Sequence, residues 1–232
     1  LSTSSISNSH ICNQRFTSIA MLFQNSLIFL ILDLLHSAAT LCINGTNNKF
    51  IVASTKEHLP VVMSELVVLT YDEDSKPSCL HDRPNVVLPG YALLSNGKLR
   101  VPRKFNLKNN TFVKMSVRNR GGSNYCENGE SVVWFIPSRY CVLDLCEFIG
   151  NELCEVLEKP GTHTVQELVD KASFNPKLKL PEPPCIAIFC LTDFFGGEWE
   201  IDFFLEYRGE IILHFRVPSN EKYLQVAVDD DE

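Results

Sequence analysis

The sequence predicts a mainly β protein, an antiparallel sandwich or cup with one short helix, held together by disulfides. In several short segments, apolar and polar residues alternate with the two-residue period of a half-buried strand. Only the segment between Tyr140 and Leu157 clearly has the three- and four-residue spacing of a helix. Eight of the nine cysteines follow residue 40, and an even number in an exported chain indicates a disulfide framework.

The N-terminal region has the pattern of an export signal. From Met21, the expected first residue, an apolar run extends to Leu35 and is followed by small residues up to Ala39. Polar residues interrupt the run, whereas roughly 20 apolar residues are needed to span a bilayer. We therefore expect cleavage near Ala39, with a retained anchor as the alternative. The expected parts are an upstream and signal segment at 1–39, one domain at 40–228 and an acidic tail at 229–232.

Composition and charge narrow the class of function. The chain has 232 residues, 45% of them hydrophobic, which is enough for one domain with a substantial core. Its net charge of −7 disfavours a nucleic-acid partner, because phosphate binding needs a basic surface. Glycosylation sequons start at Asn44 and Asn109, both in polar, turn-like surroundings. Together with the export signal, they predict a secreted or lysosomal glycoprotein.

Strands are predicted where β-branched and aromatic residues lie between turn residues. Residues 43–60 are polar and receive no assignment, and 72–84 is a charged insertion that carries Cys79. The strands predicted before the helix are 61–71, 85–90, 99–105, 111–118 and 131–136. In 111–118, Val113, Met115 and Val117 alternate with polar residues, so we expect these three side chains to share one buried face.

Two helical patterns follow. The first is a set of apolar residues spaced by three or four positions, which predicts a helix that ends before Pro160. Its members are Leu143, Cys146, Ile149, Leu153 and Leu157. The second is weaker: Thr164 and Glu167 have the spacing of a capping box, which indicates a helix starting at Val165.

The most regular segment is a β-hairpin near the C-terminus. Apolar residues alternate with mostly polar ones from Trp199 to Tyr207, and the alternation returns from Ile211 to Val217. Arg208-Gly209 lies between the two runs and supplies the turn. The hairpin therefore has one apolar face.

No catalytic or metal-binding motif is recognisable. Cys141, Cys146 and Cys154 are close enough in sequence to suggest zinc, but export favours disulfides. None of the six histidines belongs to a known motif with a nucleophile. We therefore expect neither enzyme activity nor a metal or other cofactor.

The order of short motifs between residues 55 and 218 resembles the ganglioside GM2 activator-like proteins of the MD-2-related lipid-recognition (ML) superfamily. The segment Lys159-Pro-Gly-Thr-His-Thr-Val165 is the most specific of them. The others are Pro60-Val-Val, Asn85-Val-Val-Leu-Pro-Gly90, Trp134-Phe-Ile-Pro137, Cys141-Val-Leu-Asp-Leu-Cys146, Cys154, the run from Phe174 to Pro181, and Gly197-Glu-Trp-Glu-Ile201.

The resemblance implies a β-cup, in which two splayed sheets enclose an apolar cavity for acyl chains and leave a polar headgroup near the rim. It implies non-enzymatic extraction or presentation of a glycosphingolipid or phospholipid during transient contact with a membrane surface. In the activator's case the client is a lysosomal glycosidase. It also implies that a Cys146–Cys154 bridge ties the helix to the following strand. After Thr164 it implies a strand instead of a helix, and we adopt the strand.

The cysteines depart from the family pattern. The family's bridge between the first and last strands has no counterpart, because the final strand, 211–217, holds no cysteine. Ser138 stands where the family has a cysteine, and Cys126 is the candidate replacement. An insertion at 181–195 adds Cys185 and Cys190, and Cys42 completes the set of eight.

The candidate lipid-contacting residues lie in two places. The insertion carries Ile188, Phe189, Phe194 and Phe195. It could be an apolar loop, held by its two cysteines, that inserts into a bilayer. The alternative is a strand packed in the core. The candidates for the cavity wall, or else for an ordinary core, are Trp134, Ile136, Trp199, Ile201 and Phe203. Lys159 and His163 could meet an anionic headgroup, although a solvated surface is the simpler interpretation.

Other functions are compatible with the same pattern. An ML-type fold could carry a sterol or recognise a microbial lipid. A secreted β-sandwich with a filled core could bind a protein partner, since the alternation of a packed sandwich is the same as that of an open cup. A hydrolase would require histidine and carboxylate side chains that converge in a cleft.

Overall fold

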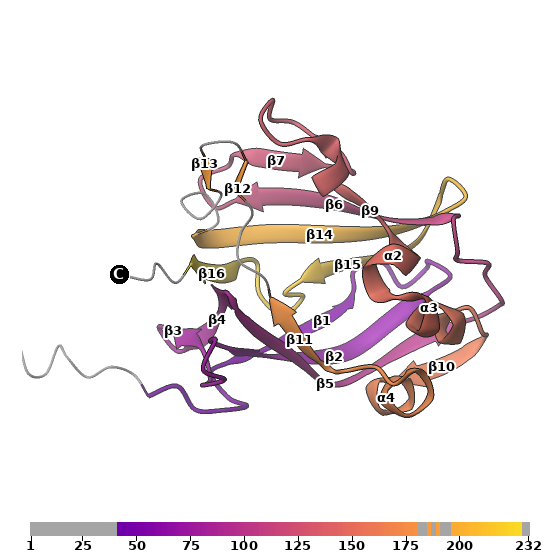
Figure 1. Ribbon diagram of the computed structural model, residues 1–232, viewed down its shortest axis with the longest axis horizontal. Coiled ribbons are helices and arrows are strands. Elements are labelled where there is room, and N and C mark those ends of the chain that lie inside the picture. The colour runs from indigo at the N-terminus through magenta and orange to yellow at the C-terminus, as the bar shows by residue number, and fades with distance from the viewer. Residues whose placement is uncertain (1–40, 181–184, 187–188, 191–195, 229–232) are drawn as a thin grey trace, which may run out of the picture. The chain divides into compact units, whose positions relative to one another are not determined.

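A computed structural model describes residues 41–180, 185–186, 189–190 and 196–228 (Figure 1). From Cys42 onward these residues belong to one unit. The predicted signal segment and the acidic tail lie outside the described residues. No helix in the described part of the chain is long and apolar enough to cross a bilayer.

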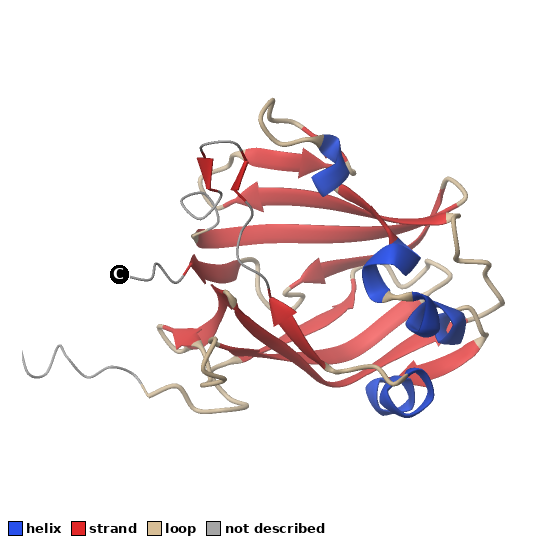
Figure 2. Ribbon diagram, viewed as in Figure 1, coloured by secondary structure: helices blue, strands red, loops and turns tan. Residues whose placement is uncertain are grey.

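Strands dominate the structure, which confirms the predicted mainly β class (Figure 2). The strands of the main sheet are β1 (Lys49–Ser54), β2 (Val62–Tyr71), β3 (Cys79–Leu80), β4 (Arg83–Leu88), β5 (Gly90–Val101), β6 (Thr111–Asn119), β7 (Asn124–Glu127), β8 (Glu130–Ser131), β9 (Val142–Asp144), β10 (Gly161–Thr164), β11 (Lys177–Leu180), β14 (Gly197–Tyr207), β15 (Glu210–Val217) and β16 (Leu224–Val228). A separate pair is β12 (Cys185–Ile186) and β13 (Phe189–Cys190). The helices are η1 (Ser138–Tyr140), α2 (Leu145–Ile149), α3 (Asn151–Leu157) and α4 (Val165–Ala172).

The main sheet is curled, so that its two halves face each other (Figure 1). Strand β1 belongs to both halves, because residues 49–52 pair with β2 and residues 53–54 pair with β15. One half continues from β2 to β5, and the other from β15 to β14 and β6. The expected cup of two sheets is therefore a single sheet folded at β1.

One end of the cup is closed by strands. The chain turns at Pro89 from β4 into β5, while β4 pairs in parallel with β16, which in turn pairs with β14. At the other end lie α2, α3 and the loop of residues 102–110, and we call this the helix end (Figure 1).

A bulge helps to curl the half that contains β2 and β5. The pairing register of these strands shifts between Ser64 and Val67, and such bulges bend a sheet and increase its twist. Gly97 lies opposite the bulge with φ +147°, and a Cβ atom there would come within 2.8 Å of the Leu66 Cα atom. The close approach of β2 and β5 therefore requires glycine at this position.

Two clusters of buried apolar side chains lie between the halves. The first, towards the helix end, includes Phe105, Val113 and Ile212. The second, towards the closed end, includes Phe50, Val68 and Trp199. The predicted inward-facing residues of β6 take part in both, since Val113 belongs to the first cluster and Val117 packs against the second.

Most of the predicted strands are confirmed, but two are wrong. Segment 99–105 covers only the end of β5, which finishes at Val101, and Phe105 lies in the loop. Segment 131–136 is a turn after β8, where the Ser131 hydroxyl donates to the Val133 carbonyl oxygen at 2.8 Å. This local hydrogen bond competes with extension of the strand.

The predicted helix up to Leu157 is confirmed in type but is broken in two. Leu143 lies in β9, and Asp144 caps α2 by accepting hydrogen bonds from the Cys146 and Glu147 amides at 2.9 and 3.1 Å. Gly150 separates α2 from α3 with φ +89°, a conformation that favours glycine. Within the described residues, the expectation of one short helix is thus corrected to three α-helices, α2, α3 and α4.

The strand that we adopted after Thr164 is wrong, and the capping box is right. Thr164 is the last residue of β10 and also the cap of α4, because its hydroxyl accepts a hydrogen bond from the Glu167 amide at 3.1 Å. The Lys-Pro-Gly-Thr motif therefore leads into a short strand that is followed at once by a helix.

Three disulfides are formed among the described residues, Cys42–Cys79, Cys126–Cys141 and Cys146–Cys154. The second gives Cys126, the candidate replacement for the family's cysteine, a partner that the sequence left open. The third exists as expected, but it ties α2 to α3, so the expectation of a helix-to-strand tie is wrong. The backbones of Cys185 and Cys190 are paired in the β12–β13 hairpin, and their side chains lie outside what the structure describes.

Candidate functional site

An apolar cavity of 540 Å³ lies between the two halves of the curled sheet, and we call it the inner chamber. All 25 residues that line it are apolar. They come from both halves of the sheet, from α2 and α3, and from the loop at the helix end, where Phe105 and Leu107 are buried. The volume lies within the range of small-molecule binding sites, about 300–1,000 Å³.

A second cavity of 510 Å³, the outer chamber, lies between β5, α3, α4 and β11. It adjoins the inner chamber, because eight residues line both. The shared residues are Met63, Leu66, Leu94, Leu99, Phe148, Ile149, Leu153 and Leu157. Two large apolar side chains in its lining are exposed to solvent, Phe148 on α2 at 65% and Leu178 on β11 at 38%. We therefore place the mouth of the cavity between these side chains.

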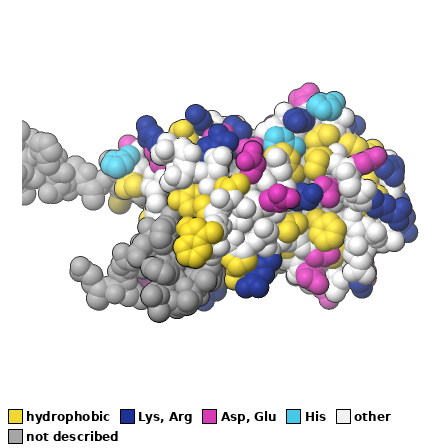
Figure 3. All heavy atoms as spheres, turned by 90° about the horizontal axis from the view of Figure 1, so that it is seen from above, with side chains coloured by type: hydrophobic (Ala, Val, Ile, Leu, Met, Phe, Trp, Pro, Cys, Tyr) yellow, Lys and Arg dark blue, Asp and Glu magenta, His cyan; other side chains and the backbone are white. Residues whose placement is uncertain are grey.

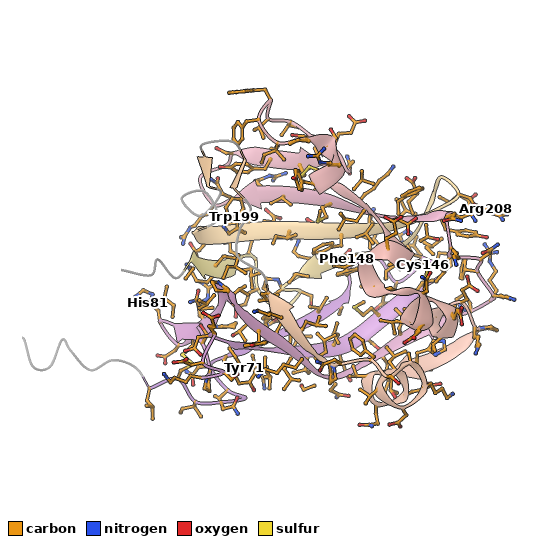
Figure 4. The ribbon with its side chains drawn as sticks, viewed as in Figure 1. Tyr71, His81, Cys146, Phe148, Trp199 and Arg208 are labelled. Carbon is orange, nitrogen blue, oxygen red and sulfur yellow. A yellow bond between two sulfur atoms is a disulfide. The ribbon has the colours of Figure 1, made fainter. Side chains whose placement is uncertain are left out.

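Phe148 is the residue that marks this mouth. Figure 4 shows its side chain at the edge of α2, beside the space between the two halves of the sheet. Helix α2 is fixed there by its Asp144 cap and by the Cys146–Cys154 bridge. A large apolar side chain in contact with both water and an apolar cavity is typical of a ligand entrance.

His163 is a polar side chain that faces the outer chamber. It pairs with Leu99 across β10 and β5, so both point to the same face, and it is only 5% exposed. Its Nε2 atom donates a hydrogen bond to the Lys159 carbonyl oxygen at 2.8 Å. Its Nδ1 atom has no hydrogen-bond partner among the described residues and lies 3.8 Å from a Glu167 carboxylate oxygen.

The predicted solvated surface is therefore wrong for His163 and right for Lys159, which is exposed. A buried nitrogen without a partner costs free energy, and a ligand group could satisfy it. Glu167 is itself held ionised, because a hydrogen bond from Lys171 lowers the pKa of its carboxyl group.

Of the five candidates for the cavity wall, the structure brings only Phe203 into the inner chamber. Trp199 is buried in the second cluster, 5.2 Å between ring centres from Tyr125, and Ile201 packs against the same cluster. Trp134 is 95% exposed in the turn after β8, and Ile136 is half-buried in that turn. Neither lines a chamber, because the segment does not form the predicted strand.

The candidates in the insertion cannot be placed in the cavity or at its rim. Ile188, Phe194 and Phe195 lie outside the described residues, and of Phe189 only the backbone in β13 is described. The sequon residues Asn44 and Asn109 are both exposed, Asn109 in the loop at the helix end.

Most residues of the cavity wall were not predicted from the sequence. Leu94 and Leu99 on β5, Met63 on β2 and Phe148 on α2 were not singled out, although each has an apolar side chain with period-2 or helical spacing. The only available signal was this alternation, which also describes a filled core.

The convergent histidine and carboxylate expected of a hydrolase lie on the outer face of the sheet. His214 Nε2 donates to Asp202 at 2.9 Å, and the Thr55 hydroxyl lies 2.5 Å from His214 Nδ1. Arg216 also donates to Asp202, at 3.0 Å. Thr55 does not line either of the two hollows beside His214, of 380 and 310 Å³. These bonds connect Thr55, the residue after β1, with the neighbouring strands β15 and β14, and ordering this face is their simplest role.

In the part of the chain that the structure describes, no three His, Cys, Asp or Glu side chains gather as a metal site would require. No model of a known protein family matches the chain, and no curated protein matches it. The ML resemblance stays a prediction based on the motifs.

Proposed function

We propose that the protein is a non-enzymatic lipid carrier that extracts or presents a lipid whose acyl chains occupy the inner chamber. The observation that carries this proposal is a cavity of 540 Å³ whose lining consists of apolar side chains alone. Water gains few hydrogen bonds in such a cavity, so apolar ligands are favoured there. The motifs of the GM2 activator-like proteins support the same function independently of the cavity.

The size of the cavity fits an acyl chain. If a methylene group takes about the 30 Å³ that a water molecule occupies, 540 Å³ accommodates about 18 such groups. The outer chamber then receives the part of the lipid next to the headgroup, where His163 Nδ1 offers a hydrogen-bonding atom. A glycosphingolipid or phospholipid carries two long chains, so its second chain would occupy the mainly apolar outer chamber as well. A lysosomal glycosidase is the proposed client for a glycolipid.

The proposed location is extracellular or lysosomal. Three disulfides among the described residues agree with an oxidising compartment, where such bridges form and persist. The motif pattern of a signal peptide between Met21 and Ala39 supports the same location.

Native mass spectrometry of the secreted protein tests the proposal, followed by organic extraction and identification of the lipid. We expect a stoichiometric lipid with one or two acyl chains. A sterol would change the ligand class while keeping the carrier function. An empty protein that takes up no lipid from mixed vesicles would contradict the proposal and favour a protein-binding sandwich.

A matched pair of variants tests whether the lipid occupies the chambers. Leu94 lines both chambers, whereas its neighbour Leu93 points to the other side of β5. We expect Leu94→Trp to lower lipid occupancy at least fivefold, because the indole fills the junction of the chambers, and Leu93→Trp to leave occupancy unchanged. Occupancy is measured by native mass spectrometry. Equal occupancy in both variants would place the lipid elsewhere.

A further inference from the structure

Positive charge is concentrated in one part of this acidic protein. Residues 83–126 contain nine Lys and Arg residues and no Asp or Glu, although the net charge of the chain is −7. Four of these nine cations are neutralised by carboxylates across the sheet. The paired cations are Arg83, Lys114, Arg118 and Arg120, and their partners are Glu198, Glu200, Glu206 and Glu221.

Unpaired cations collect at the helix end of the cup. We call six exposed residues there the basic rim. They are Arg100, Arg103, Lys104, Lys108, Lys159 and Arg208. None of the six forms an ion pair with a carboxylate of the described residues.

The hydrogen bonds of the loop bring these cations together. The Phe105 amide donates to the Glu158 carbonyl oxygen, next to Lys159, and the Arg208 amide donates to the Asn110 carbonyl oxygen. Figure 3 shows dark-blue side chains gathered at this end of the molecule, and Figure 4 places Arg208 there. Glu158 is the nearest carboxylate in sequence to the rim, and it is engaged by the Leu107 amide at 3.0 Å. Glu155 and Glu210 also lie nearby but do not balance six cations.

We infer that the basic rim docks the protein on an anionic lipid surface. This inference rests on the proposed carrier function. The loop that carries Arg103, Lys104 and Lys108 also contributes Phe105 and Leu107 to the wall of the inner chamber. A layer of lipid phosphates or carboxylates held by the rim therefore lies next to the cavity that receives the acyl chain.

The surroundings of the rim favour a lipid surface over an acidic protein. Phe112, at the start of β6 beside the loop, is 39% exposed, and Phe148 at the mouth is 65% exposed. Exposed aromatic residues beside Lys and Arg are typical of surfaces that lie in a membrane interface. Long flexible cations spread around a loop suit a layer of headgroups that can rearrange.

Flotation with vesicles tests the docking. The full secreted chain is mixed with vesicles of phosphatidylcholine alone or with about one third phosphatidylserine, at low and high salt. The rim variant is Arg103→Gln with Lys104→Gln and Lys108→Gln, which removes three charges without creating a new glycosylation sequon. The matched control is Lys49→Gln with Lys76→Gln and Lys222→Gln, which removes the same charge from exposed positions outside the rim. Because the Asn109 sequon adjoins Lys108, each protein is measured before and after removal of N-glycans.

We expect the natural protein to prefer the phosphatidylserine vesicles and to lose this preference in high salt. Each surface cation contributes roughly fivefold to such partitioning, so the rim variant should bind at least tenfold more weakly while the control stays within about twofold. Equal losses in both variants, or no preference for phosphatidylserine, would overturn the inference. Binding to immobilised polyglutamate but not to vesicles would also overturn it, in favour of an acidic protein partner.

Lipid occupancy keeps this result separate from the carrier proposal. If the rim variant still carries lipid but has lost its preference for anionic vesicles, both proposals hold. If the natural protein carries lipid but shows no such preference, only the docking fails. If it binds anionic vesicles through the rim but never carries lipid, only the carrier function fails.

Discussion

Glu198 shows how one side chain connects separate parts of the sheet. It lies on β14 and accepts hydrogen bonds from Arg83 on β4, at 3.0 Å, and from Arg120 in the loop after β6. Arg83 in turn bonds to Glu221 and to the Tyr223 carbonyl oxygen. The bonds from Arg120 and Arg83 hold the pKa of the Glu198 carboxyl group below its usual value. This network holds the closed end of the cup together.

The network makes part of the stability dependent on pH. Since the pKa of Glu198 is lower in the folded state, its contribution is complete above the unfolded value of about 4.3 and is lost as the pH falls through the folded value. We expect Glu198→Gln to lower the free energy of unfolding by about 1 kcal/mol at pH 7 and pH 5.5. Below about pH 4 the difference should shrink. Urea unfolding at each pH measures it, and a constant difference down to pH 3 would contradict the assignment.

His163 shows what could and could not be predicted at the scale of a residue. Its place in the Lys-Pro-Gly-Thr-His motif is visible in the sequence, and this position is compatible with contact to an anionic headgroup. Its burial was not predictable, because it depends on how α3 and α4 cover β10 in three dimensions. Trp134 is the opposite case, since a large aromatic residue was expected inside and lies in an exposed turn.

At the scale of elements, the local capping signal at Thr164 was more reliable than the family pattern. The capping residues Thr164 and Glu167 predicted α4, and the resemblance led us to replace the helix by a strand. The hairpin of β14 and β15 was predictable because its alternation extends over many residues. Strand β16 was not, since its few residues become a strand by pairing with β4, which is distant in sequence. Pairings of this kind leave no local signal.

The cap of α4 provides a direct test at this scale. Thr164→Ala removes the hydroxyl that accepts from the Glu167 amide, and we expect it to lower the free energy of unfolding by about 1 kcal/mol. Thr164→Ser keeps the hydroxyl and should cost only a small part of this. Chemical unfolding followed by circular dichroism measures both. An equal loss in the two variants would mean that the methyl group of Thr164, and not the cap, is responsible.

At the scale of the whole molecule, the sequence predicted the curled antiparallel fold but not whether its interior is filled. The same alternation places Val113, Leu205 and Leu213 inside in either case. The cavity arises because the two halves are joined along β1 and at the closed end, while helices and a loop separate them at the helix end. That separation is a property of the assembled chain and not of any segment.

An occupied cavity should stabilise the whole molecule. A ligand at 100 times its dissociation constant adds about 2.7 kcal/mol to the free energy of unfolding. For a domain of this size we expect the lipid of the proposed carrier function to raise the Tm of the empty protein by roughly 5–10 °C. Leu93→Trp should show the same gain and Leu94→Trp little or none. Differential scanning calorimetry measures the shift, and an equal gain in Leu94→Trp would place the stabilising site outside the chambers.

The double pairing of β1 has a mechanical consequence. Strand β1 joins the two halves of the sheet, since residues 49–52 pair with β2 and residues 53–54 pair with β15. The halves can therefore separate only on the side away from β1. We expect ligands of different volume to be accommodated by movement of β11 and of the bridged pair of helices α2 and α3, while β1 keeps its position. The amides of β1 should accordingly exchange hydrogen with solvent equally slowly whether the bound ligand is small or large. The exchange rates of amides around Phe148 should change with the volume of the ligand.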